Sequence, residues 1–344
     1  MESMIPNRVG VITVVPANGE RGGAERFYDG LVDSLSKLGV AAERVDVVSD
    51  ESSFEAIEES YLRFYDLDLS RFDGVISTKS PGYLVRHPNH VCYLQHTMRA
   101  FYDMFDVEFA NPDARLLRQR RQILRLDTLA LKPPRTRSIY VIGKEVQARL
   151  LRYNQLSSDV LYQASTMSGF RCGVAQYVFL PGRLHRWKRV GLVISAMNYM
   201  KHPIELKIAG TGEDEAYFRH LAEGNRRIRF LGRVEDRQLV ELYADALVVP
   251  FVPLREDFGL VTLEAFLSKK PVITCLDSGE PANIVRHGRS GFVCSPSPRE
   301  IASRLDYLYE NPEVARAMGK EGFESIQHIT WENVGLKLLK ALSL

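Results

Sequence analysis

Two glutamates flank the expected start of a helix, in a pattern that suits the binding of a phosphorylated sugar. Glu256 and Glu264 have seven residues between them, and the helix between them is expected to begin near Gly259. The first amides of a helix are unpaired and lie at the positive end of the helix dipole, and glycine lets an anion approach the backbone closely. Glu264, inside the helix, is placed to accept hydrogen bonds from vicinal hydroxyls, and Glu256 to face a sugar. The amides expected to bind phosphate belong to Phe258, Gly259, Leu260 and Val261.

A second stretch supplies cations. Arg183 and Lys188 flank a turn that follows an expected strand at 177–180 and leads into a helix. Arginine can bind a phosphate through two parallel hydrogen bonds, and lysine adds a point charge. The simpler interpretations are a solvated basic loop here and, for the two glutamates, an ordinary helix-start acid and an ordinary helical residue.

Repeated alternation of strands and helices must position these groups. Short apolar runs typical of strands buried on both faces occur at 9–15, 40–48, 73–77, 91–95 and 138–142, and again at 177–180, 204–209, 228–231, 246–251, 271–274 and 291–294. Helical patterns lie between them, for example at 189–200, 236–244 and 260–268. We therefore expect an α/β fold with parallel, doubly wound sheets, in which ligands bind at the carboxyl ends of the strands.

The length of 344 residues suits two domains. The polar stretch 163–173 lacks periodicity and is the expected linker. We expect an N-terminal Rossmann-like domain over 1–168, a C-terminal one over 169–328, and a final helix at 329–344 that crosses back to the first domain.

The run from Glu256 to Glu264 resembles the E-x7-E motif of retaining glycosyltransferases of family 4, which have the GT-B fold of two Rossmann-like domains facing a cleft. Neighbouring stretches resemble the same family over about residues 177–295. They are the Gly182–Lys188 segment, the Gly-rich loop Ala209–Glu213 with Gly210 and Gly212, the Phe230–Val234 and Leu239–Tyr243 segments and the Ser290–Val293 strand.

The resemblance implies a hexosyltransferase that binds a nucleotide-sugar donor and needs no metal or other cofactor. Arg183 and Lys188 would neutralise the donor diphosphate, Glu264 would hold the ribose, and Glu256 the transferred sugar. The Gly-rich loop would also contact the donor. One departure is Asn283, which stands where family members often carry an acid, and no role is carried over to it.

The N-terminal half offers two further candidates. Gly22 and Gly23 lie between the first strand and helix, where a glycine pair can form an anion-binding nest, although a dinucleotide fingerprint is absent. His96 follows the strand at 91–95, and in the family a histidine in a similar position contacts the donor sugar. For the glycine pair the alternative is a plain turn, and for the histidine, independently, it is a structural role. The stretch 95–103, with 125–127, also looks like mannosyltransferase members.

The most basic tract runs from Arg115 to Arg137, with eight cations and the single acid Asp127. On a helical projection its leucines form one face and Arg118, Arg121 and Arg125 the other, but Arg120 falls among the leucines. Two interpretations remain, a solvated helix and a surface for anionic lipid or a phosphate-bearing acceptor. Nucleic acid is disfavoured because no aromatic residues interleave the arginines.

Composition adds limits. Net charge is +2, no apolar run approaches the roughly 20 residues of a membrane span, and the four cysteines show no metal-binding or redox spacing. A cytoplasmic protein, peripheral at most to the inner face of the membrane, is expected.

The predicted activity is retaining transfer from GDP-mannose, or next a UDP-sugar, to a glycan or lipid-linked acceptor in polysaccharide biosynthesis. The alternatives are a nucleotide-sugar epimerase or hydrolase, and a non-catalytic nucleotide-sugar-binding protein.

Overall fold

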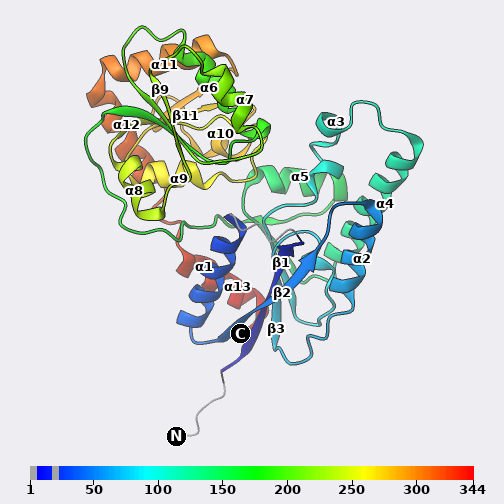
Figure 1. The fold of residues 1–344 in the computed structure, drawn as a ribbon. Coiled ribbons are helices and arrows are strands. Elements are labelled where there is room, and N and C mark those ends of the chain that lie inside the picture. The colour runs from blue at the N-terminus through cyan, green and yellow to red at the C-terminus, as the bar shows by residue number, and fades with distance from the viewer. Residues whose placement is uncertain (1–5, 18–22) are drawn as a thin grey trace, which may run out of the picture. The chain divides into compact units, whose positions relative to one another are not determined.

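The structure, a computed structural model, describes residues 6–17 and 23–344. Residue contacts divide the chain into two compact units, Met1–Thr166 with Ile329–Leu344, and Met167–His328. Each unit is built around one six-stranded sheet in which every strand pair is parallel. This is the α/β architecture expected from the alternation of strands and helices (Figure 1).

The first unit has the strand order β2-β1-β3-β4-β5-β6. Its strands are β1 (Arg8–Pro16), β2 (Ala41–Ser49), β3 (Gly74–Ser77), β4 (His90–Leu94), β5 (Ser138–Val141) and β6 (Asp159–Val160). Its helices are α1 (Gly23–Lys37), α2 (Phe54–Tyr65), α3 (Phe105–Glu108), α4 (Ala114–Leu131), α5 (Lys144–Asn154) and α13 (Trp331–Leu342). Strand β1 lies inside the sheet, between β2 and β3, and its apolar run, including Val9, Val11 and Ile12, is fully buried.

The C-terminal helix α13 packs against α1, so the last residues complete the first unit (Figure 1). The ring centroids of Phe27 and Trp331 are 5.7 Å apart, and the Ser34 hydroxyl donates to the Trp331 carbonyl at 2.6 Å. Gly30 and Gly335 allow the helices to approach closely, since a Cβ on either would lie within 2.6 Å of a partner side chain.

The second unit has the strand order β12-β11-β10-β7-β8-β9. Its strands are β7 (Tyr177–Pro181), β8 (Leu206–Ala209), β9 (Ile228–Gly232), β10 (Ala246–Pro250), β11 (Val272–Cys275) and β12 (Gly291–Cys294). Its helices are α6 (Val190–Met197), α7 (Glu215–Leu221), α8 (Asp236–Ala244), α9 (Leu260–Leu267), α10 (Glu280–Ile284), α11 (Pro298–Glu310) and α12 (Pro312–Ser325). Strands β8 and β9 follow on one side of β7, and β10, β11 and β12 follow on its other side. The strand order thus reverses between β7 and β10, which makes this the switch point of the sheet.

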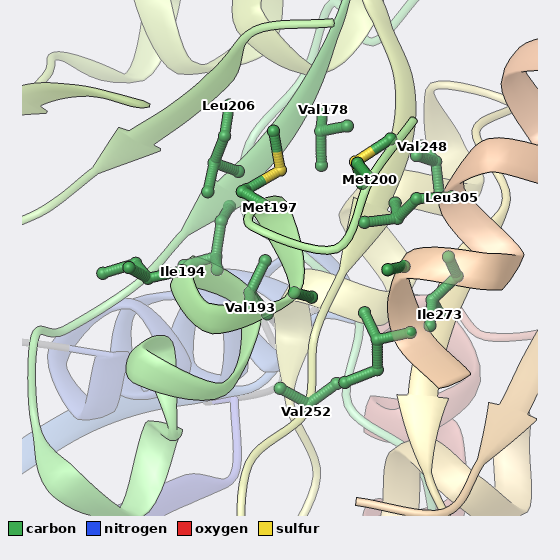
Figure 2. Packing of buried hydrophobic residues seen from close by; sticks show 14 of the residues in the cluster. Val178, Val193, Ile194, Met197, Met200, Leu206, Val248, Val252, Ile273 and Leu305 are labelled. Atoms are coloured by element: carbon green, nitrogen blue, oxygen red, sulfur yellow. The ribbon is translucent and has the colours of Figure 1, made fainter. Parts of the chain in front are cut away.

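The core of the second unit joins the sheet to its helices (Figure 2). Strand residues such as Val178 and Val248 meet Ile194 and Met197 of α6 and Leu305 of α11, all fully buried. This packing fixes the strand ends from which the loops at the switch point emerge.

A carboxylate is buried inside the first unit. Asp127 of α4 is fully buried and accepts hydrogen bonds from the hydroxyls of Tyr61 at 2.8 Å and Tyr102 at 2.7 Å. Burial raises the pKa of Asp127 to about 6, because desolvation outweighs the opposing effect of the tyrosine bonds. The single acid of the basic tract therefore faces the interior rather than the neighbouring arginines.

We predict that the free energy of unfolding of wild type falls as the pH rises, and that Asp127→Asn removes the part of this fall that comes from Asp127. The folded-state pKa lies above the unfolded one, so this group stabilises the fold fully below about pH 4 and loses that contribution as the pH rises through 6. The loss is on the order of 2–3 kcal/mol. The measurement is the free energy of unfolding of wild type minus that of the variant, at pH 4.5 and at pH 7. The subtraction cancels the pH dependence that other titrating groups, such as His90, contribute to both proteins. A difference that does not change with pH would contradict the assignment.

Candidate functional site

The loops that follow β7 and β10 meet at the switch point and form a small pocket. Leu180–Arg183, Lys188 and Val190 line it from the β7 side, and Pro250–Val252 line it from the β10 side. Both cations singled out from the sequence, Arg183 and Lys188, therefore lie on one pocket at the carboxyl end of the sheet. Ligands of doubly wound sheets bind at this position.

An ion pair joins the two loops. The Lys188 ammonium lies 2.6 Å from the Glu256 carboxylate, and the two side chains are 29% and 19% exposed. The ammonium also lies 5.7 Å from the ring centroid of Phe251. The pair is thus partly shielded from water, where an electrostatic contact is stronger than on an open surface.

Gly259 makes room for this arrangement. It has φ +77° and immediately precedes α9, and a Cβ here would lie 2.5 Å from the Phe251 ring and 3.3 Å from the Glu256 side chain. Because only glycine adopts this conformation without strain, the helix can begin directly beside the ion pair. Phe258 is buried, and Leu260 and Val261 form the first residues of α9, so the four amides predicted to bind phosphate belong to this helix start.

Glu264 lies more than one turn inside α9 and is 6% exposed. Its carboxylate accepts a hydrogen bond from the Tyr243 hydroxyl at 2.8 Å. Tyr243 is itself fully buried and packs edge-to-face on Phe179, with ring centroids 5.1 Å apart. The aromatic pair holds this carboxylate in place, and nothing in the sequence indicated that Tyr243 would be the partner of Glu264.

The glycines of the loop after β8 have a packing role. Gly210 has φ +130°, and a Cβ there would lie 1.9 Å from the Gly182 carbonyl oxygen, while one on Gly212 would lie 2.4 Å from the Leu184 carbonyl oxygen. These glycines let the β8 loop lie directly against the β7 loop. The same loop carries Glu213, whose carboxylate accepts from Arg183 at 3.1 Å. Contact of Gly210 and Gly212 with a donor stays a prediction.

Arg189, which the sequence reasoning missed, ties three loops together. Its guanidinium donates to the carbonyls of Val252 at 2.7 Å and Pro253 at 2.8 Å, and to both Asp277 oxygens at 2.7 Å. Burial disfavours the charged form of Asp277, but the bonds from Arg189 outweigh it and lower the pKa of that carboxyl. The expected helix from 189 begins one residue later, because Arg189 adopts φ +50° and closes the turn instead.

Backbone hydrogen bonds also join the loop after β11 to Glu256. The Glu256 amide donates to the Ser278 carbonyl at 2.9 Å, and the Glu280 amide donates to the Glu256 carbonyl at 2.9 Å. Gly279 between them has φ +75°, and a Cβ there would lie 2.4 Å from the Glu256 oxygen. Glu280 is fully buried, and its carboxylate accepts from the Asn283 amide at 3.3 Å. Asn283, where family members often carry an acid, is thus hydrogen-bonded to an acid, Glu280, one turn earlier.

The remaining candidates lie in the first unit. His96 follows β4, is partly buried, and its Nδ1 lies 3.0 Å from the Thr97 carbonyl. Gly23 begins α1, and Gly22 lies outside the described residues. The roles of His96 and of this glycine pair stay predictions.

The structure sorts the cations of the basic tract into two groups. Arg120 donates to the carbonyls of Phe101 and Tyr102 and stacks 4.0 Å from the Phe105 ring, which explains its place among the leucines. Three others are also held by the fold: Arg115, Arg135 and Arg137. Within the tract, all of which the structure describes, four exposed cations have no ion-pair or hydrogen-bond partner: Arg118, Arg121, Arg125 and Lys132.

Two negative findings concern only the part of the chain that the structure describes. In residues 6–17 and 23–344, no cluster of three or more metal-ligating side chains of the His, Cys, Asp or Glu type is found. Across the same ranges, no helix has both the length and the apolar character that crossing a bilayer requires.

Most of the second unit matches a known protein family in sequence. Residues 175–325 match the family model described as Glycosyl transferases group 1. The D-rhamnosyltransferase WbpZ of Pseudomonas aeruginosa is 30% identical over 148 residues, which is 42% of this chain and 39% of that protein. The human alpha-1,3/1,6-mannosyltransferase ALG2 is 29% identical over 153 residues, which is 42% of this chain and 34% of that protein. The matched regions thus span well under half the length of these two relatives.

Solved structures match both units. Sucrose-phosphate synthase of Thermosynechococcus elongatus aligns with a TM-score of 0.74 at 17% identity, covering 97% of this chain and 98% of that one. Anabaena HepE, solved in complex with UDP and glucose, aligns with a TM-score of 0.73 at 14% identity, covering 98% and 99%. At these identities the likeness establishes the fold alone, and the chain has the GT-B fold.

We predict that Arg189→Lys destabilises the second unit by roughly 1–3 kcal/mol, because a lysine cannot serve two carbonyls and both carboxylate oxygens at once. The measurement is the free energy of unfolding in urea. The matched control is Arg219→Lys, since Arg219 pairs with Glu215 on the surface of α7; it should change stability by less than about 0.5 kcal/mol. Equal effects of the two substitutions would refute the linking role of Arg189.

Proposed function

We propose that this protein is a retaining glycosyltransferase whose nucleoside diphosphate sugar binds at the carboxyl ends of β7 and β10. One observation carries the proposal. Lys188, Glu256 and the Gly259 helix start come together beside Arg183 at the switch point of a unit that matches a glycosyl transferase family model. A diphosphate needs such cations and helix-start amides, and a sugar needs carboxylates that accept from its hydroxyls.

The chemical task assigned to these residues is electrostatic. Breaking the glycosidic bond leaves negative charge on the departing diphosphate, which Arg183, Lys188 and the α9 amides would stabilise without rearranging. Glu264, fixed by Tyr243, would accept from the ribose hydroxyls, and Glu256 from those of the transferred sugar. Two cations and a helix start neutralise the diphosphate here, so no metal is required by the proposal.

The names of the relatives guide the choice of donor. WbpZ is named a D-rhamnosyltransferase and ALG2 a mannosyltransferase, while HepE was solved with UDP and glucose. GDP-mannose is our first donor, with UDP-sugars next, and the acceptor is a glycan or a lipid-linked glycan. A nucleotide-sugar epimerase or hydrolase would consume donor without acceptor, and a non-catalytic binding protein would bind donor without turnover.

We predict that Lys188→Ala and Glu264→Ala each remove most transfer activity while the fold survives, the first by loss of a charge on the departing diphosphate and the second by loss of the ribose contact. Loss of one charge stabilising a transition state costs roughly 2.7–4 kcal/mol, about 10²–10³ in rate. A thermal-shift screen of nucleotide sugars first identifies the donor, because a bound ligand raises apparent stability by mass action. Transfer is then measured across a panel of glycan and lipid-linked acceptors. Wild-type turnover in either variant would end the site assignment.

We also propose that α4 rests on an anionic membrane surface. Its unpaired cations Arg118, Arg121 and Arg125, with Lys132 directly after the helix, recur at helical spacing along one side, and Leu117 and Leu129 of the same helix are 37% and 52% exposed. Cations beside exposed leucines suit the boundary between lipid headgroups and acyl chains. A lipid-linked acceptor would then be reached from the membrane.

We predict that the triple change Arg118→Gln, Arg121→Gln, Arg125→Gln weakens binding to phosphatidylcholine vesicles containing phosphatidylglycerol by about 100-fold, at about 1 kcal/mol for each cation. Co-sedimentation at low salt is the measurement, and pure phosphatidylcholine vesicles should bind neither protein. The control removes three exposed cations of the second unit through Lys201→Gln, Arg226→Gln and Lys320→Gln. If the control loses as much binding as the test variant, α4 is not the membrane surface.

A further inference from the structure

Both cations assigned to the donor diphosphate already have a carboxylate partner. Lys188 pairs with Glu256 at 2.6 Å, and Arg183 pairs with Glu213 at 3.1 Å. In each pair the cation comes from the β7 loop and the acid from a different loop. A phosphate that binds either cation therefore competes with a carboxylate for the same charge.

The two pairs differ in how much the competition matters. The side chains of Arg183 and Glu213 are 56% and 47% exposed, so water and salt weaken that contact. The Lys188–Glu256 pair is 29% and 19% exposed, and the Phe251 ring lies beside it. Replacing the carboxylate partner of Lys188 by a phosphate therefore changes the binding free energy more than the same replacement at Arg183.

The backbone of Glu256 is not free to follow its side chain. It is paired on one side with Ser278 and on the other with Glu280, and Gly279 packs directly against it. Lys188 is likewise fixed through its neighbour Arg189, which is bonded to Asp277. Loss of the ion pair thus moves the Glu256 side chain alone, and the released carboxylate stays within the site.

We propose that Glu256 is a resident counter-anion of Lys188 which the donor diphosphate displaces, and that the displaced carboxylate then accepts hydrogen bonds from the donor's sugar. This inference rests on the proposed function. A nucleoside diphosphate without sugar breaks the ion pair and gives Glu256 no new partner. A complete donor breaks the same pair and supplies hydroxyls in its place, so the site discriminates in favour of the complete donor.

The same exchange assists product release. After transfer the nucleoside diphosphate no longer carries hydroxyls for Glu256, and the carboxylate competes again for Lys188. Glu256 thereby favours departure of the product that occupies its position, without touching the reacting bond. This is a role in specificity and turnover that is separate from stabilising the transition state.

The test is calorimetric titration of UDP and GDP, followed by UDP-glucose and GDP-mannose, into wild type and Glu256→Gln. We expect the variant to bind the nucleoside diphosphate roughly two- to fivefold more tightly, as removal of a partly exposed ion pair allows. The preference for the nucleotide sugar over the diphosphate should fall by at least as much. General repulsion between Glu256 and phosphate would also tighten binding, so both titrations are repeated with Lys188→Ala and with the double variant.

The exchange predicts that Glu256→Gln has no effect on diphosphate affinity once Lys188 is absent, whereas simple repulsion predicts the same gain in both backgrounds. Glu215→Gln, which removes another ion-paired acid of the same unit, on α7, is the control and should leave affinity unchanged. Unchanged or weaker diphosphate binding in Glu256→Gln, or a gain that persists without Lys188, overturns the exchange while an active wild type keeps the proposed function. Failure of wild type to bind any of the four nucleotides contradicts both.

Discussion

A lysine from the loop after β7 and a glutamate from the loop after β10 meet at 2.6 Å at the switch point of the second sheet. The arrangement of the candidate site depends on this contact. Parallel strands bring the two loops to one edge, Gly259 starts a helix beside the pair, and Arg189 fixes the loops against each other. The backbone positions of the charged residues are thus set before any ligand arrives, as electrostatic preorganisation requires, and in our proposal only the Glu256 side chain moves when the donor binds.

Close backbone approach recurs around the site and explains its glycines. Gly210 and Gly212 press the β8 loop against the β7 loop, and Gly279 presses the β11 loop against Glu256. Each contact leaves no room for a Cβ. The glycines therefore shape the loops that present the charged side chains, and several of them have this role whether or not they also touch a ligand.

Local pattern was sufficient for the fold, because buried parallel strands read as short apolar runs. It also pointed to Arg183, Lys188 and Glu256, which follow such runs directly and which the structure brings together. It was insufficient for contacts between residues far apart in the sequence. Arg189 and Asp277 are 88 residues apart, and nothing near either one predicts their pairing. Arg120 was anomalous on a helical projection, and only the tertiary structure shows the carbonyls and the Phe105 ring that accommodate it. Tyr243 was likewise invisible as the partner of Glu264.

The most direct measurement of the central claim is a crystal structure of the protein with its nucleotide-sugar donor bound. If the claim holds, diphosphate oxygens lie within hydrogen-bond distance of the Lys188 ammonium and of the amides at the Gly259 helix start. The Glu256 carboxylate has then left Lys188 and lies against hydroxyls of the sugar. A donor bound elsewhere, with the Lys188–Glu256 ion pair intact, would contradict it.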